Sequence, residues 1–361
     1  MKKYYFTSES VTEGHPDKIC DKISDKILDE ALKKDPNSHM AVEATIKDNL
    51  IFLYGEASTS AKINYEKIAK NILKDIGYKE RFDVITKISQ QSVEINKAVS
   101  KEEVCAGDQG IMFGYACNET KELMPLPIML ANKLAMRLTE VRKKDKNSFL
   151  LPDGKTQVTV EYVDGKPSRV DTIIIACQHK ENIDKEKLEY FIKKEVISYV
   201  LNDNLCDDNT KILINTSGKF TIGGPFADSG TTGRKIVVDT YGGMGRIGGG
   251  CFSSKDPSKV DRSAAYYARY VARNIVSKGY ADKVEIGLSY AIGKAQPISI
   301  FIETFGTNKT SVSEIEKYVY DNFDFSVANI IKELDLKKPI YYDLASYGHF
   351  GRKGYSWEKD K

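Results

Sequence analysis

The sequence predicts an α+β protein in which one order of elements, strand–helix–hairpin–helix–strand, occurs three times. In some segments apolar residues alternate, as in half-buried strands, and in others they recur every three or four residues, as in amphipathic helices. The three predicted hairpins begin near residues 40, 156 and 283. Strands of this kind form sheets with one buried face, so each unit should be a sheet covered by helices on one face.

The first unit, residues 1–97, opens with the strand YYFTSES. A helix from Asp17 to Lys34 follows, in which apolar residues recur every four positions. The pattern then predicts a hairpin from Met40 to Ala57 with its turn near Asp48. A helix from Tyr65 to Ile76 and the apolar segment VITKIS complete the unit.

The second unit, residues 110–221, opens with GIMFGYAC and a helix from Pro127 to Lys143. A hairpin turning at Asp164-Gly165 follows, because this dipeptide favours tight two-residue turns. TIIIAC is its return strand. A helix from Leu188 to Val200 and the segment KILIN close the unit.

The third unit, residues 222–361, is predicted to open with a strand, RKIVVDTY, and to continue with a helix from Asp261 to Lys278. Alternating apolar residues predict strands around Val284 and Ile298. A helical region from Ser313 to Leu334 and the segment IYYDLASYG complete the unit. Between the first two units the chain is polar and lacks periodicity, which is typical of a functional lid or a mobile linker.

Composition excludes several classes of protein. The 54 basic and 51 acidic residues leave a net charge of +3, so no global basic field attracts nucleic acid. The N-terminus lacks the apolar run of a signal peptide and no apolar stretch is long enough to span a bilayer, so we expect a cytoplasmic protein with no membrane partner. Six scattered cysteines without a CxxC pair indicate reduced, mostly buried thiols.

The stretch from Thr221 to Arg262 combines glycines with cations and carboxylates. Glycines let backbone amides approach a ligand closely, and the basic side chains suit a polyphosphate. Carboxylates among so many cations are useful if divalent metal ions bridge the protein to phosphate oxygens. The alternative is a glycine-rich surface loop. The cations are Arg234, Lys235, Arg246, Lys255, Lys259 and Arg262, and the carboxylates are Asp228, Asp239 and Asp261.

Two charged turns precede predicted helices. In HPDK, His15 and Lys18 would lie at a helix N-terminus, which attracts anions, and Asp17 could bind a metal ion. The alternative is that Asp17 only caps the helix behind Pro16. KDPSKVDR has the same form, and there the alternative is a capping box between Ser258 and Asp261.

Common nucleotide and metal motifs are missing. Nothing matches a P-loop, no GxGxxG follows a strand, and neither GxSxG nor HExxH occurs. The four histidines lack metal-ligand spacing, which argues against a zinc or iron centre. Two further charged turns, LPDGKTQV around Asp153 and GDQG around Asp108, are weak signals alone.

Taken together, these segments resemble methionine adenosyltransferase, also called S-adenosylmethionine synthetase. The resemblance covers essentially the whole chain and rests on FTSESVTEGHPDKI, GDQG, MFGYACNET, PDGKTQV, GGP, TGRKIVVDTYGG, KDPSKVDRSAAY and YGHFGR. It implies three domains related by pseudo-threefold symmetry and discontinuous along the chain, with residues 98–109 in a mobile loop that gates the site. It also implies a homotetramer, a dimer of dimers whose active sites lie between two subunits.

The resemblance further implies transfer of the adenosyl group of ATP to the sulfur of L-methionine, followed by hydrolysis of the released triphosphate. Two Mg²⁺ ions and one K⁺ ion per site are implied, with Asp17 and Asp261 for Mg²⁺ and Glu43 for K⁺. The implied catalytic residues are His15, Lys155, Arg234 and Lys255. The implied ATP-binding residues are His15, Asp153, Lys155, Lys219, Phe220, Asp228, Arg234, Lys235, Cys251 and Lys255. The implied methionine-binding residues are Glu56, Gln91, Asp108, Asp228 and Lys259.

Three positions depart from the family pattern, which often has alanine at Cys251, histidine at Ile247 and glycine at Ser254. Asp239 receives no role, and strand-end solvation is its simplest interpretation. A non-catalytic polyphosphate-binding module on the same fold is the main alternative function, although every metal aspartate and phosphate-binding lysine is present. An RNA-binding module would need a basic face that the charge balance does not indicate.

Overall fold

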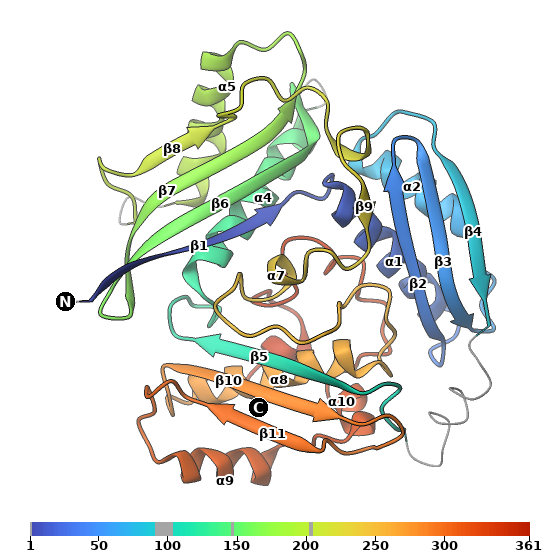
Figure 1. Ribbon diagram of the computed structural model, residues 1–361, viewed down its shortest axis with the longest axis vertical. Coiled ribbons are helices and arrows are strands. Elements are labelled where there is room, and N and C mark those ends of the chain that lie inside the picture. Colours follow the sequence, from blue (N-terminus) through green and yellow to red (C-terminus); the bar gives the residue numbers. More distant parts are fainter. Residues whose placement is uncertain (1, 91–103, 146–147, 202–204) are drawn as a thin grey trace.

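The computed structural model describes residues 2–90, 104–145, 148–201 and 205–361. Three sheets surround a common centre, where the glycine-rich stretch lies (Figure 1). Helices pack against one face of each sheet, and together they give the mixed α+β architecture that the sequence predicts.

The first sheet has the order β4-β3-β2-β9. Its buried face packs on α1 and α2, whose apolar residues recur at helical spacing. The β2–β3 turn contains Asp48 with a positive φ of 49°, at the predicted position. The bounds are α1 (Pro16–Leu32), β2 (His39–Lys47), β3 (Leu50–Ser58), α2 (Tyr65–Ile76), β4 (Asp83–Ser89) and β9 (Gly230–Thr231).

The second sheet has the order β1-β6-β7-β8 and encloses a separate apolar core beneath α4 and the helical run from Lys185 to Val200. Asp164 and Gly165 both adopt positive φ in the β6–β7 turn, as the Asp-Gly pair predicts. The bounds are β1 (Lys3–Val11), α4 (Leu126–Lys144), β6 (Leu150–Val163), β7 (Lys166–His179), α5 (Lys185–Phe191), the π-helix η1 (Ile192–Ile197), α6 (Ser198–Val200) and β8 (Lys211–Ile214).

The third sheet has the order β11-β10-β5 and packs on α8. The helical region expected from Ser313 to Leu334 is two helices, because Phe323 is extended and Ser326 caps a new helix. The bounds are β5 (Gly110–Cys117), α8 (Val260–Ser277), β10 (Lys283–Tyr290), β11 (Ser299–Glu303), α9 (Val312–Asn322) and α10 (Val327–Glu333). Short elements are the 3₁₀ turns η2 (Gly224–Phe226) and η3 (Ser356–Glu358) and the helix α7 (Ile236–Asp239).

Each sheet contains a strand from another unit of the sequence. β1 pairs with β6 of the second sheet, β5 pairs with β10 of the third, and β9 pairs with β2 of the first. The expectation that each unit builds its own sheet is therefore wrong for the strand that opens it. This exchange brings the end of β1, the start of α1 and the glycine-rich stretch to the centre of the molecule (Figure 1).

Two predicted strands of the third unit are also wrong. In RKIVVDTY the apolar run Ile236–Asp239 forms α7, a single helical turn. IYYDLASYG forms turns rather than a strand, and its Tyr341 and Leu344 are buried in the core. A short apolar run does not distinguish a strand from other buried backbone, which explains both errors.

The sheet faces opposite the helices carry exposed apolar side chains. All three sheets contribute such residues: Tyr5 of β1, Phe52 of β3, Ile111 of β5 and Phe301 of β11. Each lies at an alternate position from the buried residues of its strand. An apolar surface spread over three sheets is unusual for a chain that acts alone.

Candidate functional site

Helix α1 begins at the HPDK turn and is capped by His15, not by Asp17. The His15 Nδ1 accepts a hydrogen bond from the backbone N–H of Asp17 at 3.2 Å, and Pro16 occupies the first helical position. Asp17 is thus free of any capping role. Its Oδ1 instead accepts the backbone N–H of Thr231 at 3.0 Å, so the capping alternative is wrong for this residue.

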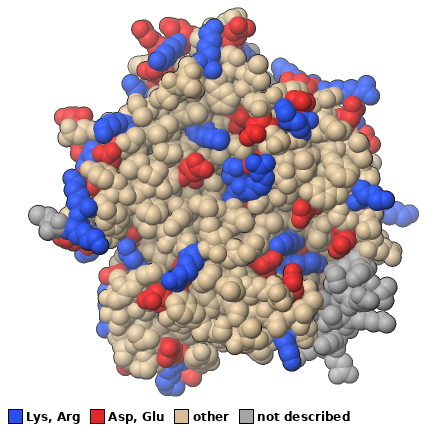
Figure 2. All heavy atoms as spheres, viewed as in Figure 1, with Lys and Arg blue, Asp and Glu red and all other residues tan. Residues whose placement is uncertain are grey.

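Asp17 faces two cations of the glycine-rich stretch. Lys235 Nζ lies 2.5 Å from Asp17 Oδ2, and Arg234 Nε lies 3.7 Å from Oδ1. The Arg234 side chain is 52% exposed, so much of its guanidinium remains open to a ligand. Figure 2 shows lysine and arginine side chains gathered near the centre of this face, with carboxylates beside them.

His15 is held in its neutral form. Burial, together with the charges of Lys235 and Lys155, lowers the pKa of His15 to about 3, against opposing effects of Asp17 and Asp228. Because Nδ1 accepts a backbone hydrogen bond, the ring proton of the neutral form belongs on Nε2. His15 is therefore a neutral hydrogen-bond donor surrounded by charged groups.

The PDGK segment, which lies inside β6 and not in the charged turn predicted ahead of a strand, adds a buried carboxylate beside this group. Asp153 Oδ2 accepts the backbone N–H of Gly224 at 2.7 Å, whereas its buried Oδ1 has no hydrogen-bond partner among the described residues. Burial raises the pKa of Asp153. Asp153 interacts electrostatically with Lys155 and Asp228, both of which are exposed. The structure thus brings seven predicted site residues together: His15, Asp17, Asp153, Lys155, Asp228, Arg234 and Lys235.

A second group forms at the start of α8. Lys255 Nζ lies 2.5 Å from Asp261 Oδ2. A Cβ on Gly250 would lie 2.1 Å from the Asp261 carboxyl carbon, so the glycine is what lets the backbone wrap around this carboxylate. Lys259 is the N-cap of α8 and no side chain caps the helix, so the Ser258–Asp261 capping box does not form.

The first sheet places two further predicted residues beside this second group. Lys255 forms a β-bridge with Ala41, whose partner across the β2–β3 ladder is Glu56. Glu43 lies on the same face of β2 as Ala41. The charges of Glu43 and Lys255 both act on the pKa of the Cys251 thiol. Burial raises the pKa of Cys251 to about 11, so this thiol is not activated.

Cys251 also connects the two groups. A Cβ on Gly233 would lie 2.5 Å from the Cys251 Sγ, so the backbone just before Arg234 packs directly on this side chain. The departure from the family pattern at this position is therefore accommodated between the two groups of charged residues.

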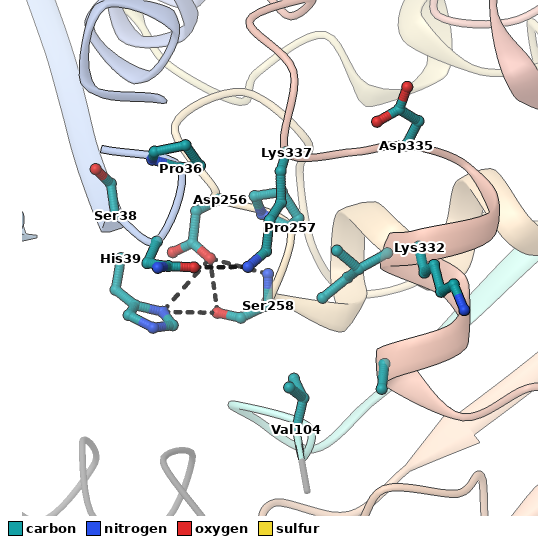
Figure 3. Close-up of a pocket in the computed structure, with 13 residues that line it drawn as sticks. Pro36, Ser38, His39, Val104, Asp256, Pro257, Ser258, Lys332, Asp335 and Lys337 are labelled. Carbon is teal, nitrogen blue, oxygen red and sulfur yellow. Dashed lines mark hydrogen bonds and ion pairs between the residues drawn. The ribbon is translucent and has the colours of Figure 1, made fainter. Parts of the chain in front are cut away.

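Four predicted residues make contacts other than those of the two groups, or are exposed. Lys259 Nζ donates to Asp256 at 2.6 Å. Asp256 also binds Ser258 beside His39, at one side of a cavity of about 590 Å³ (Figure 3). Lys219 is exposed and Phe220 exchanges hydrogen bonds with His179 at the end of β7. Asp108 is exposed before β5.

One predicted residue and much of one predicted segment cannot be placed. Gln91 and the first part of the gating segment 98–109 lie outside the described residues.

The sequence interpretation missed a buried row of carboxylates on α1, the aspartate row: Asp17, Asp21, Asp25 and Asp29. Their spacing of four residues places them on one helix face and could have been noticed. Asp239 is related to this row, because it pairs with Lys18, which also binds Asp21 at 3.0 Å. Strand-end solvation is therefore the wrong interpretation of Asp239, which is fully buried beside His349.

Comparison with protein families covers nearly the whole chain. Residues 3–103 match the S-adenosylmethionine synthetase N-terminal domain, residues 103–220 its central domain, and residues 222–359 its C-terminal domain. The chain belongs to the S-adenosylmethionine synthetase family. The matches agree with the resemblance seen in the sequence motifs. Within the described residues, no helix of this synthetase-family chain combines the length and apolarity needed to cross a membrane.

The two groups suit Mg²⁺ only if a ligand completes the coordination. The described residues contain no cluster of three or more His, Cys, Asp or Glu side chains able to hold a metal ion. Asp17 and Asp261 each present a single carboxylate next to a lysine. Mg²⁺ accepts one or two protein carboxylates when phosphate oxygens and water fill its other positions, so the donor set fits a metal–polyphosphate complex.

Proposed function

We propose that this protein synthesises S-adenosylmethionine from ATP and L-methionine and hydrolyses the bound triphosphate to phosphate and diphosphate. The observation that carries the proposal is the convergence of Arg234, Lys235 and Lys155 on neutral His15 and Asp17. These groups derive from three different parts of the chain, and a polyphosphate is the ligand whose charge they match. Membership of the synthetase family supports the same reaction.

The proposed chemistry needs leaving-group stabilisation more than a base. The neutral methionine sulfur attacks C5′ of ATP, the C5′–O bond breaks, and the triphosphate leaves with the bonding electrons. Positioning and electrostatic stabilisation of that charge would provide most of the catalysis. His15 would donate its Nε2 proton in a hydrogen bond near the breaking bond. Lys155, Arg234, Lys235 and Lys255 would bind the phosphates.

The remaining predicted contacts stay part of the proposal. Asp153, Lys219, Phe220 and Cys251 would contact the nucleoside side of ATP, and Asp228 would contact both substrates. Glu56, Gln91, Asp108 and Lys259 would contact methionine. Because the Lys259 ammonium donates to Asp256, contact with methionine would require it to leave that carboxylate.

Two metal ions and one potassium ion complete the proposal. Asp17 and Asp261 would each hold one Mg²⁺, and Glu43 would hold K⁺. When bound, Mg²⁺ would neutralise charge on the phosphate oxygens. Lys235 and Lys255, which pair with these two carboxylates, would bind the same triphosphate.

We further propose a homotetramer in the cytoplasm, built as a dimer of dimers. The exposed apolar side chains on the outer faces of all three sheets suit contact with a second copy. Glu43 and Glu56 lie on the outer face of the first sheet, where a second copy could complete a shared site. Sedimentation velocity would test the assembly, and a monomer at micromolar concentration would contradict it.

The deciding experiment mixes purified protein with ATP, methionine, Mg²⁺ and K⁺ and measures S-adenosylmethionine, phosphate and diphosphate. Equal amounts of the three products are expected. Triphosphate hydrolysis without consumption of methionine would contradict the transferase assignment. Binding of Mg²⁺–tripolyphosphate without any turnover would instead favour the non-catalytic polyphosphate-binding alternative.

Variants of two residues from different groups test the site. Lys155→Met and Asp261→Ala should each lower kcat/KM by at least about a hundredfold, the scale of losing one contact to a developing charge. Lys166→Met is the control, because this lysine is exposed and opens β7 beside Val163, the last residue of β6. Wild-type activity in either site variant would remove that residue from the site.

A further inference from the structure

The aspartate row connects helix α1 to the third unit, residues 222–361, through backbone hydrogen bonds. Asp17 accepts the N–H of Thr231, and Asp25 accepts the N–H of Ser254. Asp29 accepts two such bonds, from Tyr341 and Tyr342. These aspartates thus hold three backbone segments, around residues 231, 254 and 341, against one face of the helix.

Asp21 holds the segment that carries the two phosphate-directed cations. Its Oδ1 accepts the backbone N–H of Gly233 at 2.8 Å, and Gly233 directly precedes Arg234 and Lys235. The Asp21 side chain is fully buried, and its Oδ2 lies 3.0 Å from Lys18 Nζ. Lys18 also pairs with Asp239, so Asp21 is anchored by a buried charge network that does not reach solvent.

Position 233 favours glycine for two reasons. Gly233 has a positive φ of 82°, and Cys251 packs where a side chain would be. Without an external hold, neighbouring cations would repel one another, and a glycine-containing turn is free to move. A ligand would then lose affinity to the cost of ordering the turn.

We propose that Asp21 is a positioning residue, which holds the Thr231–Lys235 turn so that Arg234 and Lys235 are already placed for the polyphosphate before it binds. This inference rests on the proposed function for the identity of the ligand. Asp21 itself touches no ligand and acts only through the Gly233 amide.

Asp29 provides a matched control on the same helix. It is also buried and accepts two backbone hydrogen bonds, at 3.0 and 2.9 Å. Those bonds hold residues 341 and 342 rather than the glycine-rich stretch. A purely structural role for the aspartate row predicts that changes at Asp21 and Asp29 have the same effect on ligand binding, whereas positioning predicts that they differ.

The test compares Asp21→Leu, Asp21→Asn and Asp29→Leu by calorimetric titration with Mg²⁺–tripolyphosphate. Leucine and asparagine are similar in size and uncharged, and both leave Lys18 paired with Asp239, but only asparagine can accept the Gly233 N–H. We expect Kd to rise about tenfold or more in Asp21→Leu, in line with loss of a buried hydrogen bond. Asp21→Asn should recover most of the affinity, and Asp29→Leu should stay within about twofold of the wild type.

Hydrogen exchange of the wild-type protein without ligand gives a second readout that does not depend on a variant folding. The amides of residues 231–233, each of which donates a hydrogen bond, should be protected before ligand is added. Fast exchange there would overturn the proposal, and so would equal Kd changes in Asp21→Leu and Asp29→Leu, an unrescued Asp21→Asn, or absence of tripolyphosphate binding by the wild type.

Neither calorimetry nor hydrogen exchange needs turnover. The positioning role of Asp21 and the proposed synthetase function can therefore fail separately. If the wild type binds tripolyphosphate but makes no S-adenosylmethionine, the reaction assignment fails and the role of Asp21 is still decided by the affinities. If turnover occurs, KM for ATP should rise in Asp21→Leu by about the same factor as the Kd.

Discussion

Two arginines of the third unit pair with two aspartates of the same helix, yet their surroundings differ completely. Arg234 lies 3.7 Å from Asp17 and is 52% exposed. Arg262 donates to both oxygens of Asp25, at 2.8 and 2.7 Å, and both side chains are 0% exposed. The first guanidinium can still bind a ligand. The charge of the second is neutralised by Asp25 in the protein interior.

The comparison shows that helix α1 contributes to a candidate binding site at its N-terminal end and to the buried interior further along. Near its N-terminus, α1 presents a carboxylate whose cationic partners remain partly open to solvent. Two turns further on, the same kind of pair is buried and satisfied by Tyr266, Lys255 and Ser253 as well. Exposure, rather than the Arg–Asp pair itself, therefore decides whether the pair contributes to binding or to stability.

The largest expected effect is on stability, at the buried pair. Arg262→Ala leaves the Asp25 carboxylate buried without its counter-charge, which should lower the free energy of unfolding by about 3–5 kcal/mol. Urea denaturation of the wild type and variant measures this. The double variant Asp25→Leu/Arg262→Met should recover much of the loss, and a single variant as stable as the wild type would remove the distinction between the two pairs.

The next effect is on activity, at the exposed pair. Arg234→Met should lower kcat/KM by about a hundredfold, because a cation directed at the leaving phosphates is lost. Its free energy of unfolding should change by less than about 1 kcal/mol, because an exposed ion pair contributes little. Urea denaturation and the product assay on one preparation check both. A large loss of stability with normal activity would reverse the assignment.

A smaller effect, on the pH dependence of stability, comes from Asp29. This member of the aspartate row accepts backbone hydrogen bonds but pairs with no cation among the described residues. Burial raises the pKa of Asp29 to about 6, although the Tyr341 and Tyr342 amides act in the opposite direction. Between its unfolded pKa of about 3.9 and this value, the folded chain binds more protons than the unfolded chain. The free energy of unfolding contributed by Asp29 therefore falls as pH rises through this window.

Asp29→Asn removes that titration. Relative to the variant, the wild type should lose about 2 kcal/mol between pH 4 and pH 6.5. Denaturation across this range measures the difference. Parallel pH profiles for the two proteins would show that Asp29 is already charged at pH 4.

The smallest expected effect is on activity, at two neighbouring glycines near Lys255 and Asp261. A Cβ on Gly250 would collide with the Asp261 carboxylate, whereas a Cβ on Gly249 would meet nothing within 4 Å. Gly250→Ala should lower activity about tenfold by displacing the carboxylate, and Gly249→Ala should leave activity unchanged. Equal activity of the two variants would mean that the position of Asp261 is not critical.

The sequence predicts local elements better than their partners. The helix from Tyr65 to Ile76 has the predicted bounds because its apolar residues and the Gly77 cap are all local. Periodicity did not show the strand exchange among sheets, because β1 pairs with residues 144 to 160 positions away. RKIVVDTY was predicted as a strand because its apolar run is too short to show a helical period.

The same division holds for the site. Glycine, cations and aspartate in short segments indicated a polyphosphate, and the structure brings six predicted site residues together around His15. The buried role of Asp239 could not be predicted, because its partner Lys18 is 221 residues away in the sequence. Lys259 belongs to a matching motif, but its ammonium donates to a neighbouring carboxylate, which no sequence pattern showed.

The exchange of opening strands has a consequence for how the chain is made. The first sheet takes its edge strand from residues 230–231, so its pairing remains incomplete until more than half of the chain has been synthesised. At ordinary translation rates that delay is on the order of ten seconds. Until then β2 exposes an unpaired edge, which other nascent chains could join. Synthesis on closely spaced ribosomes should therefore be the step at which this fold depends most on chaperones.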